Sequence, residues 1–140
     1  LPIYKRALSM SKAELEKIEW NEALSVNHPL LDQQHQTLIG VINWMVDSIN
    51  GGEDVSVLKQ LDAFESLYFE HFHREELILI RINYPDATAH TETHRKYEKR
   101  VHELVQKAHQ DISPKSPYRP TSPRPATQCG CYLTAARELI

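Results

Sequence analysis

The sequence is poor in the features that mark cross-linked, membrane-spanning or nucleic-acid-binding proteins. Its two cysteines, Cys129 and Cys131, are separated by one glycine, so they allow a strained disulfide at best. No apolar run approaches the roughly 20 residues that a membrane-spanning helix needs, and residues 1–20 lack the apolar core of a signal peptide. With a formal net charge of -3, the chain also lacks the basic surface that phosphate binding requires. We therefore expect a soluble, cytoplasmic protein with no membrane segment and no nucleic-acid partner.

Histidine is the residue type that stands out in an otherwise average composition. Apolar residues make up 41% and charged residues 25% of the 140 residues, as in many soluble proteins, so composition alone indicates no function. A chain of this length forms one domain with a hydrophobic core rather than two. Eight histidines are present, and their positions in the helical pattern indicate what the protein does.

Three segments show the apolar periodicity of amphipathic helices, at about residues 30–50, 54–83 and 87–112. In each segment, residues that recur at spacings of three, four and seven form one inward face. These faces consist of Leu31, His35, Leu38, Ile42, Met45 and Ile49; of Leu61, Phe64, Tyr68, His71, Glu75, Ile78 and Ile82; and of His90, His94, Tyr97, Val101, Leu104 and Ala108. Polar residues therefore interrupt all three inward faces.

The ends of the predicted helices are marked by residues that start or stop a helix. Pro29 suits a first turn, and Gly52 lies where the first helix should end. Asp54 can cap the second helix, and Pro85 separates the second helix from the third. Because the connections are short, successive helices are expected to be antiparallel neighbours, as in an up-and-down bundle.

The domain organisation follows from changes in composition along the chain. Residues 1–19 are predicted to be an extension or linker, of which residues 11–18 either form a short helix or lead into the domain. Residues 20–112 form the predicted helical domain. Five prolines occur in the twelve residues Pro114–Pro125, which no helix can accommodate, so residues 113–140 are expected to be a disordered, proline-rich tail.

Two pairs of potential metal ligands occur at the spacing of one helical turn. His71 with Glu75, and His90 with His94, each lie four residues apart and so share one helix face. His35 adds an imidazole on the inward face of the first helix. One such pair is weak evidence, because a lone inward histidine is more often a hydrogen-bonded core residue. Five inward ligands on three successive helices indicate a metal centre, which would satisfy imidazoles that are otherwise costly to bury.

The residues around these ligands resemble the hemerythrin family, and particularly its bacterial members. The resemblance covers about residues 18–112. It rests on four motifs that occur in order: Trp20; Leu31-Asp32-Gln33-Gln34-His35; His71-Phe72-His73-Arg74-Glu75-Glu76; and Tyr84-Pro85 with His90-Thr91-Glu92-Thr93-His94.

The resemblance implies an all-α fold, an antiparallel up-and-down four-helix bundle that holds two non-haem irons and binds dioxygen reversibly. By this match His35 and His71 ligate one iron, His90 and His94 ligate the other, and Glu75 bridges the two.

The chain departs from the family at the fourth helix, which should supply one more histidine and an aspartate. His109 and Asp111 are two residues apart rather than five, and His109 lies about 20 Å beyond His94 along the same helix. We therefore expect the fourth helix to be missing or replaced by the proline-rich tail. The di-iron centre would then be incomplete, and the open helical groove would favour a homo-oligomer.

Other notable residues have simpler interpretations. His73 and His102 are predicted to lie at the surface, and His28 at the end of a helix. Asp32 either hydrogen-bonds a ligand histidine or caps the first helix. The aromatics expected to form core or lid are Trp20, Trp44, Phe64 and Tyr68.

Three classes of function fit this pattern, of which non-enzymatic oxygen binding, by a carrier, store or sensor domain, ranks first. A di-iron enzyme of the ferritin-like type ranks second, because such sites use more carboxylate ligands than this chain offers. A metal-free helical interaction module with a degenerate site ranks third. Zinc is an alternative to iron, since histidine and glutamate also suit that metal.

Overall fold

The computed structural model of the protein describes residues 14–112, which form one short and three long helices. These are the 3-10 helix η1 over Glu22–Leu24, and the α-helices α2 over Pro29–Gly51, α3 over Asp54–Arg81 and α4 over Ala87–Ile112. No strand occurs within the described range. The prediction of an all-α fold is therefore confirmed for this part of the chain.

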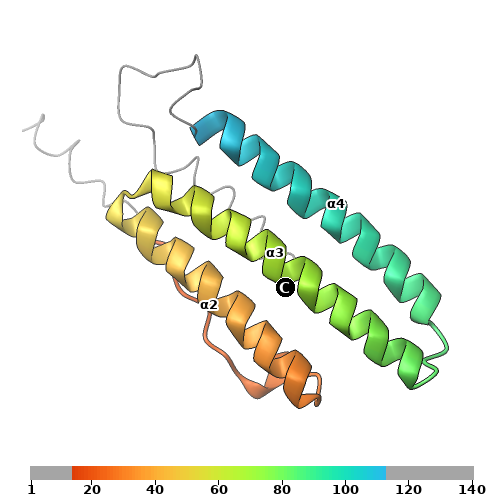
Figure 1. Ribbon diagram of the computed structural model, residues 1–140. Coiled ribbons are helices and arrows are strands. Elements are labelled where there is room, and N and C mark those ends of the chain that lie inside the picture. Colours follow the sequence, from red (N-terminus) through yellow and green to blue (C-terminus); the bar gives the residue numbers. More distant parts are fainter. Residues whose placement is uncertain (1–13, 113–140) are drawn as a thin grey trace, which may run out of the picture.

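The three long helices lie side by side with α3 in the middle (Figure 1). Both α2 and α4 pack against α3, and the short connections make neighbouring helices antiparallel. Between residues 14 and 112, no helix combines the length and the apolar character needed to cross a membrane. The predicted tail at 113–140, where a fourth helix is expected to be missing, lies outside the described residues.

A glycine ends α2 as the sequence predicts. Gly52 has a φ of 77°, a left-handed conformation that other residues adopt at a cost. Its N–H donates to Ile49 O at 3.1 Å, and the N–H of Glu53 donates to Ser48 O at 2.8 Å, so two terminal carbonyls of the helix are satisfied. The predicted cap of α3 is wrong by one residue, because that helix begins at Asp54 and Glu53 holds the capping position.

Helix α3 is two residues shorter at its C-terminus than the range of about 54–83 predicted from the sequence. It ends at Arg81 because Asn83 turns into the left-handed region, with a φ of 53°. The N–H of Tyr84 then donates to Leu79 O at 2.9 Å and closes the turn toward α4.

The core forms where the apolar faces of the three helices meet. Its members share near-complete burial, and many have no measurable exposure, among them Ile42, Met45, Leu61, Phe64 and Val101. Among the polar residues, Gln60 is also fully buried, and its amide donates to Ser48 Oγ at 2.7 Å. The predicted inward face of α2 is thus largely buried. The prediction is wrong for Ile82, which follows the last residue of α3 and is 62% exposed, and Tyr97 on the predicted inward face of α4 is 38% exposed.

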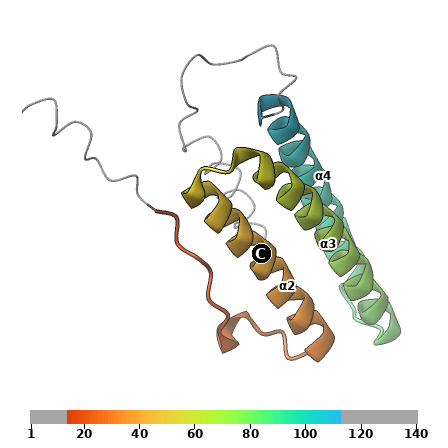
Figure 2. The same ribbon diagram turned by 60° about the vertical axis from the view of Figure 1, so that its left-hand side comes forward.

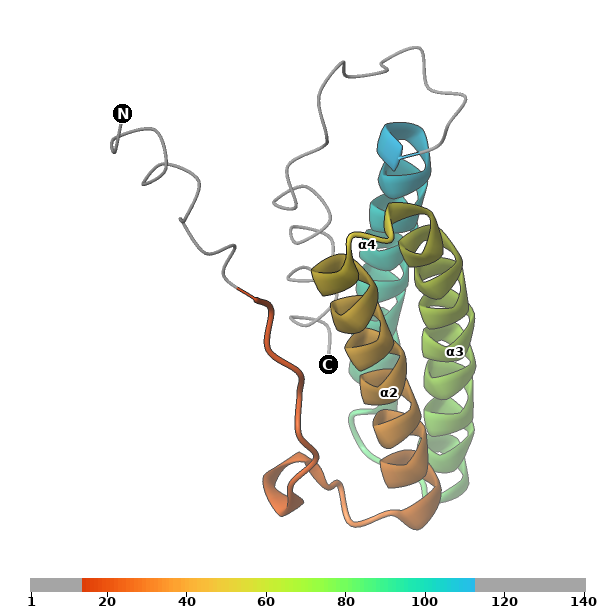
Figure 3. The same cartoon turned by 90° about the vertical axis from the view of Figure 1, so that its left-hand side faces the viewer.

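The chain before α2 is fastened to that helix by two asparagines. Asn50 exchanges two hydrogen bonds with the backbone of Leu15, both 3.0 Å long, and Asn43 does the same with Ile18 at 2.7 and 2.9 Å. The spacings match, since seven helical residues and three extended ones each span about 10 Å. Figures 2 and 3 show this red-orange segment running beside α2. Of the two alternatives for residues 11–18, the described residues 14–18 contain no helix and lead into the domain.

The predicted aromatic core is correct in part. Phe64 and Tyr68 are buried and stack with their ring centroids 5.3 Å apart, whereas Trp20 is half-buried. Trp44 is 55% exposed, so its assignment to core or lid is wrong. It precedes buried Met45 on α2, and adjacent helical positions point about 100° apart, so burial of one does not imply burial of the other.

Candidate metal centre

A cavity of about 160 Å³ lies between the three long helices, near the end of the bundle where α3 connects to α4. Its lining includes every residue predicted from the sequence to bind metal, together with four aromatic or aliphatic side chains and a threonine. The lining residues are His35, Leu38, Tyr68, His71, Phe72, Glu75, His90, Thr93, His94 and Tyr97. The structure thus brings together five residues that are up to 59 positions apart in the sequence, from 35 to 94.

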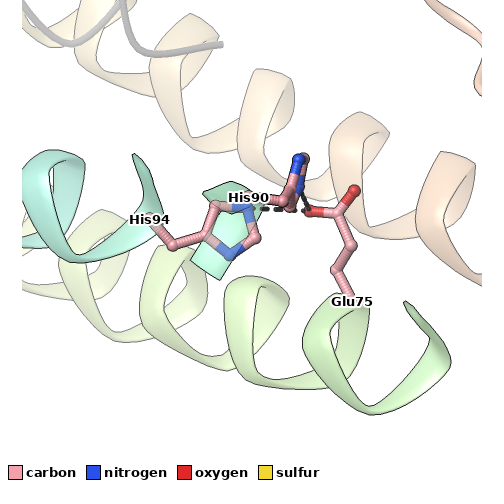
Figure 4. Close-up of side chains that lie close together, drawn as sticks. All are labelled: Glu75, His90 and His94. Carbon is pink, nitrogen blue, oxygen red and sulfur yellow. Dashed lines mark ion pairs between the residues drawn. The ribbon is translucent and has the colours of Figure 1, made fainter. Parts of the chain in front are cut away.

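Glu75 lies at the middle of the cavity, between histidines of two helices. Its Oε2 is 3.2 Å from His94 Nε2 and 3.5 Å from His90 Nε2, both on α4. The same oxygen is 3.9 Å from His71 Nε2, one turn earlier on α3. Figure 4 shows the two α4 imidazoles directed at this carboxylate. The donor atoms of Glu75, His90 and His94 all lie within 4.8 Å of one another, so these three side chains could hold a metal ion together.

His35 and His71 form the other half of the centre. Their Nε2 atoms are 3.0 Å apart, and their rings meet edge to face. On its far side the His71 ring donates from Nδ1–H to Gln34 Oε1 at 3.1 Å, which leaves the lone pair on Nε2, facing the cavity.

His94 is fixed in place by contacts on two sides of its ring. Phe72 stacks on it with centroids 3.8 Å apart and planes inclined by 6°. Its Nδ1–H donates to Glu76 Oε1 at 2.9 Å, and Arg95 in turn donates to both oxygens of Glu76. The ring can therefore present only Nε2 to the cavity.

His90 has a buried ring nitrogen that faces the Glu75 carboxylate at 3.5 Å. Its Nε2 is fully buried and, within the described structure, has no hydrogen-bond partner. A buried nitrogen without a partner costs about 1–3 kcal/mol, so native proteins rarely keep one. Coordination of a metal would satisfy this atom, and the donor set of imidazoles and one carboxylate fits iron or zinc.

The charge states of these groups follow from burial and from each other. Burial would raise the pKa of Glu75, but the hydrogen bond from His94 and the electrostatic attraction of the neighbouring histidines outweigh it and lower the pKa to about 2. Burial and the neighbouring His35 lower the pKa of His71 to about 4, so its ring is neutral and ready to bind metal. Burial also disfavours protonated His94, yet Glu75 and Glu76 together raise its pKa.

The wall of the cavity is apolar. Leu38 and Phe72 are buried beside the histidines, and burial raises the pKa of the Tyr68 hydroxyl, so that this ring stays neutral. Such a wall limits the entry of water and strengthens every electrostatic interaction inside.

The remaining histidines lie outside the cavity, as predicted. His73 is exposed, and exposed His102 contacts Glu65 at 2.7 Å. His28 occupies the position just before α2. His109 contacts Asp62 at 2.7 Å, toward the other end of the bundle, and so takes no part in the centre.

Asp32 fulfils neither of its two predicted roles. It accepts hydrogen bonds from Ser25 Oγ at 2.6 Å and from the N–H of Val26 at 2.8 Å. It therefore holds the segment that leads into α2 rather than a ligand histidine, and these two hydrogen bonds lower its pKa.

The residues that orient the ligands were not predicted from the sequence, namely Gln34, Phe72, Glu76 and Arg95. Each is the immediate neighbour of a predicted ligand in the sequence, but adjacent helical positions point about 100° apart. No spacing rule therefore signals that Glu76 meets a ring 18 residues later.

The comparison with known proteins agrees with this geometry. The chain is 31% identical over 91 residues to a bacteriohemerythrin of Methylococcus capsulatus, an alignment that covers 64% of this chain and 70% of that protein. The chain belongs to the hemerythrin family.

Other members of the hemerythrin family are similarly distant. A hemerythrin-like protein of Naegleria gruberi is 33% identical over 78 residues, covering 56% of this chain and 60% of its own length. A bacteriohemerythrin of Stenotrophomonas maltophilia is 29% identical over 96 residues, covering 67% of this chain and 63% of its own length. The chain thus spans about three fifths of these hemerythrin relatives. No family model matches the chain, and no solved structure matches it.

Proposed function

We propose that this hemerythrin-family chain binds dioxygen reversibly at a non-haem di-iron centre, as a carrier, store or sensor domain and not as an enzyme. The residues that would hold the two irons are His35, His71, Glu75, His90 and His94. One observation carries the proposal: the Glu75 carboxylate lies between two pairs of imidazoles, with its Oε2 3.2 Å from His94 and 3.9 Å from His71.

The donor set supports iron and a non-enzymatic role. Four imidazoles and one carboxylate give fewer anionic ligands than the sites of ferritin-like enzymes, and neutral nitrogens stabilise ferrous iron. Bound ferrous iron would supply the redox chemistry needed to bind dioxygen. The protein's part is to orient the donors and to exclude water with Leu38, Tyr68 and Phe72. The cavity of about 160 Å³ holds more than one small ligand, since a water molecule occupies roughly 30 Å³.

Five donors are fewer than the seven that the resemblance implies for two irons. The missing histidine and aspartate belong to the fourth helix, and residues 113–140 offer no matching segment. We therefore expect less than full occupancy of one of the two positions. Self-association through a groove beside α2 and α4 stays a prediction of the sequence, and light scattering of the full chain tests it.

The test of the proposal is an anaerobic reconstitution of the full chain with ferrous iron. We expect the chain to retain iron after desalting, to gain visible absorption on exposure to oxygen, and to lose it again when oxygen is removed. A chain that binds no iron, or whose oxygenated spectrum cannot be reversed, contradicts the proposal.

Zinc is the second candidate, and one observation favours it. Two histidines and a glutamate, such as His90, His94 and Glu75, form a common zinc-binding set. Zinc is colourless and inert toward oxygen. Metal analysis of the purified protein, combined with the visible spectrum, therefore distinguishes a zinc site from an oxygen-binding iron site.

A further inference from the structure

The two halves of the centre are supported by different outer partners. On the His35 and His71 side, the His71 Nδ1–H donates to a neutral amide, Gln34 Oε1, at 3.1 Å. On the His90 and His94 side, the His94 Nδ1–H donates to a carboxylate, Glu76 Oε1, at 2.9 Å. The two halves therefore differ in the acceptor behind the ligand ring, which is an amide oxygen for His71 and a carboxylate oxygen for His94.

The Glu76 carboxylate is itself held firmly. Arg95, the residue after His94, donates from Nη2 to Oε1 at 2.7 Å and to Oε2 at 2.5 Å. Arg95 also binds Glu98 one turn along α4. Glu76 is 9% exposed, and the Arg95 guanidinium contacts both of its carboxylate oxygens at this depth. The Glu76–Arg95 pair thus links α3 to α4 directly behind the His94 ring.

We propose that Glu76, held by Arg95, is a positioning residue that gives the His90/His94 half of the centre the higher metal affinity of the two halves. This inference rests on the proposed metal centre. A carboxylate that accepts from the outer nitrogen of an imidazole fixes the ring and makes the inner nitrogen a stronger donor. Gln34 fixes the His71 ring as well, but as a neutral acceptor it adds less to the basicity of Nε2.

Two further features make the same half better prepared for metal. The bridging carboxylate is nearer to it, since Glu75 Oε2 is 3.2 Å from His94 Nε2 and 3.9 Å from His71 Nε2. Stacking on Phe72 adds a second restraint on the His94 ring. A donor that is already oriented loses less freedom on binding, which increases affinity. The first ion should therefore bind at the His90/His94 half, and the second at the His35/His71 half.

The order of binding can be measured without oxygen. Metal-free full chain is titrated anaerobically with Co²⁺, a coloured stand-in for ferrous iron, while visible absorption and bound metal are recorded. We expect two steps of different affinity. In Glu76→Gln, which keeps the size and an acceptor oxygen, the first step should weaken by about 10-fold or more, while the second step should change little.

Glu70→Gln is the matched control. Glu70 lies on the same helix and pairs with Arg74 as Glu76 pairs with Arg95, but in the described structure it contacts no histidine ring. Its loss removes the same charge and should leave both steps unchanged. The reciprocal variant, Gln34→Glu, places a carboxylate behind the His71 ring. It should reduce the difference in cobalt affinity between the two binding steps.

Several outcomes would overturn the inference. It is wrong if the parent binds cobalt in one step of equal affinity, if Glu76→Gln and Glu70→Gln behave alike, or if Gln34→Glu leaves the gap unchanged. Thermal unfolding of the metal-free variants checks that Glu76→Gln is folded, so that a change confined to one step is not a loss of structure. Ordered cobalt binding without reversible oxygen binding would contradict the proposed function and leave this inference standing. A parent chain that binds no cobalt refutes both.

Discussion

Nε2 of His35 lies 3.0 Å from Nε2 of His71, on a different helix and 36 residues later in the sequence. In the metal-free protein, one of these nitrogens must carry a proton and the other a lone pair, because two lone pairs at this distance repel. Since the His71 ring donates from Nδ1 to Gln34, the proton between the rings belongs to His35. A cation would replace that proton and bind both nitrogens.

Iron content should depend on individual ligand histidines. His71→Ala removes one donor from the His35/His71 half of the centre, and His90→Ala removes one donor from the His90/His94 half. Iron affinity should then fall by more than the roughly 10- to 100-fold that the loss of an outer hydrogen-bond partner costs. Iron per chain after desalting measures the effect. His73→Ala, an exposed histidine of the same helix as His71, is the control, and unchanged iron in both ligand variants would contradict the assignment.

Removal of metal should lower the stability of the bundle. The inward imidazoles and Glu75 then lose their common partner in an apolar interior. At a free metal concentration of 100 times the Kd, binding contributes about 2.7 kcal/mol to the free energy of unfolding. For a domain of this size that is about 10 °C or more in Tm. Thermal unfolding with and without a chelator measures the shift, and equal melting temperatures would count against a metal centre.

The metal-free protein should lose stability in acid because of His71. The pKa of this buried ring is lowered from 6.5 to about 4, so between these pH values the unfolded chain takes up a proton that the folded chain does not. The contribution of neutral His71 to the free energy of unfolding is complete above pH 6.5. As the pH falls toward 4 this contribution is lost, by at most about 1.4 kcal/mol per pH unit. His94 acts in the opposite direction, because its pKa is raised.

Comparison of variants isolates the contribution of His71. Urea unfolding of metal-free His71→Gln should show a smaller loss of stability between pH 6.5 and 4 than the parent. His73→Gln removes an exposed histidine and should show the acid sensitivity of the parent. If His71→Gln is as acid-sensitive as the parent, the neutral, buried state assigned to this ring is wrong.

The asparagine that fastens the chain before α2 should contribute measurably to stability. Asn43→Ala removes two hydrogen bonds to the backbone of Ile18, of 2.7 and 2.9 Å, each with a net value of about 0.5–1.5 kcal/mol. We expect the free energy of unfolding to fall by about 1–3 kcal/mol in urea denaturation. Gln36→Ala replaces an exposed polar residue on the same helix and should have little effect. A loss no larger than in this control would show that the segment is held by apolar packing alone.

The sequence by itself determined the three helices and the faces that they bury. Helical periodicity is a local property, so the four-residue spacings of His71 with Glu75 and of His90 with His94 placed each pair on one face before any tertiary contact was known. Both ends of α2 and the start of α4 were predicted to within a residue, because Pro29, Gly52 and Pro85 act on the backbone next to them. The C-terminus of α3 was less accurate, since Asn83 gives no strong signal for a left-handed turn.

Only the tertiary structure decided which side chains orient the ligands. The hydrogen bonds between Glu76 and His94, Gln34 and His71, and Asn43 and Ile18 join residues that are 18, 37 and 25 positions apart in the sequence. Each contact depends on how far one segment is rotated and shifted along its neighbour. Those two quantities are set by the packing of the whole core, from Ile42 to Val101, rather than by any spacing within one helix. A shift of one residue would keep the helical pattern and separate Glu76 from His94.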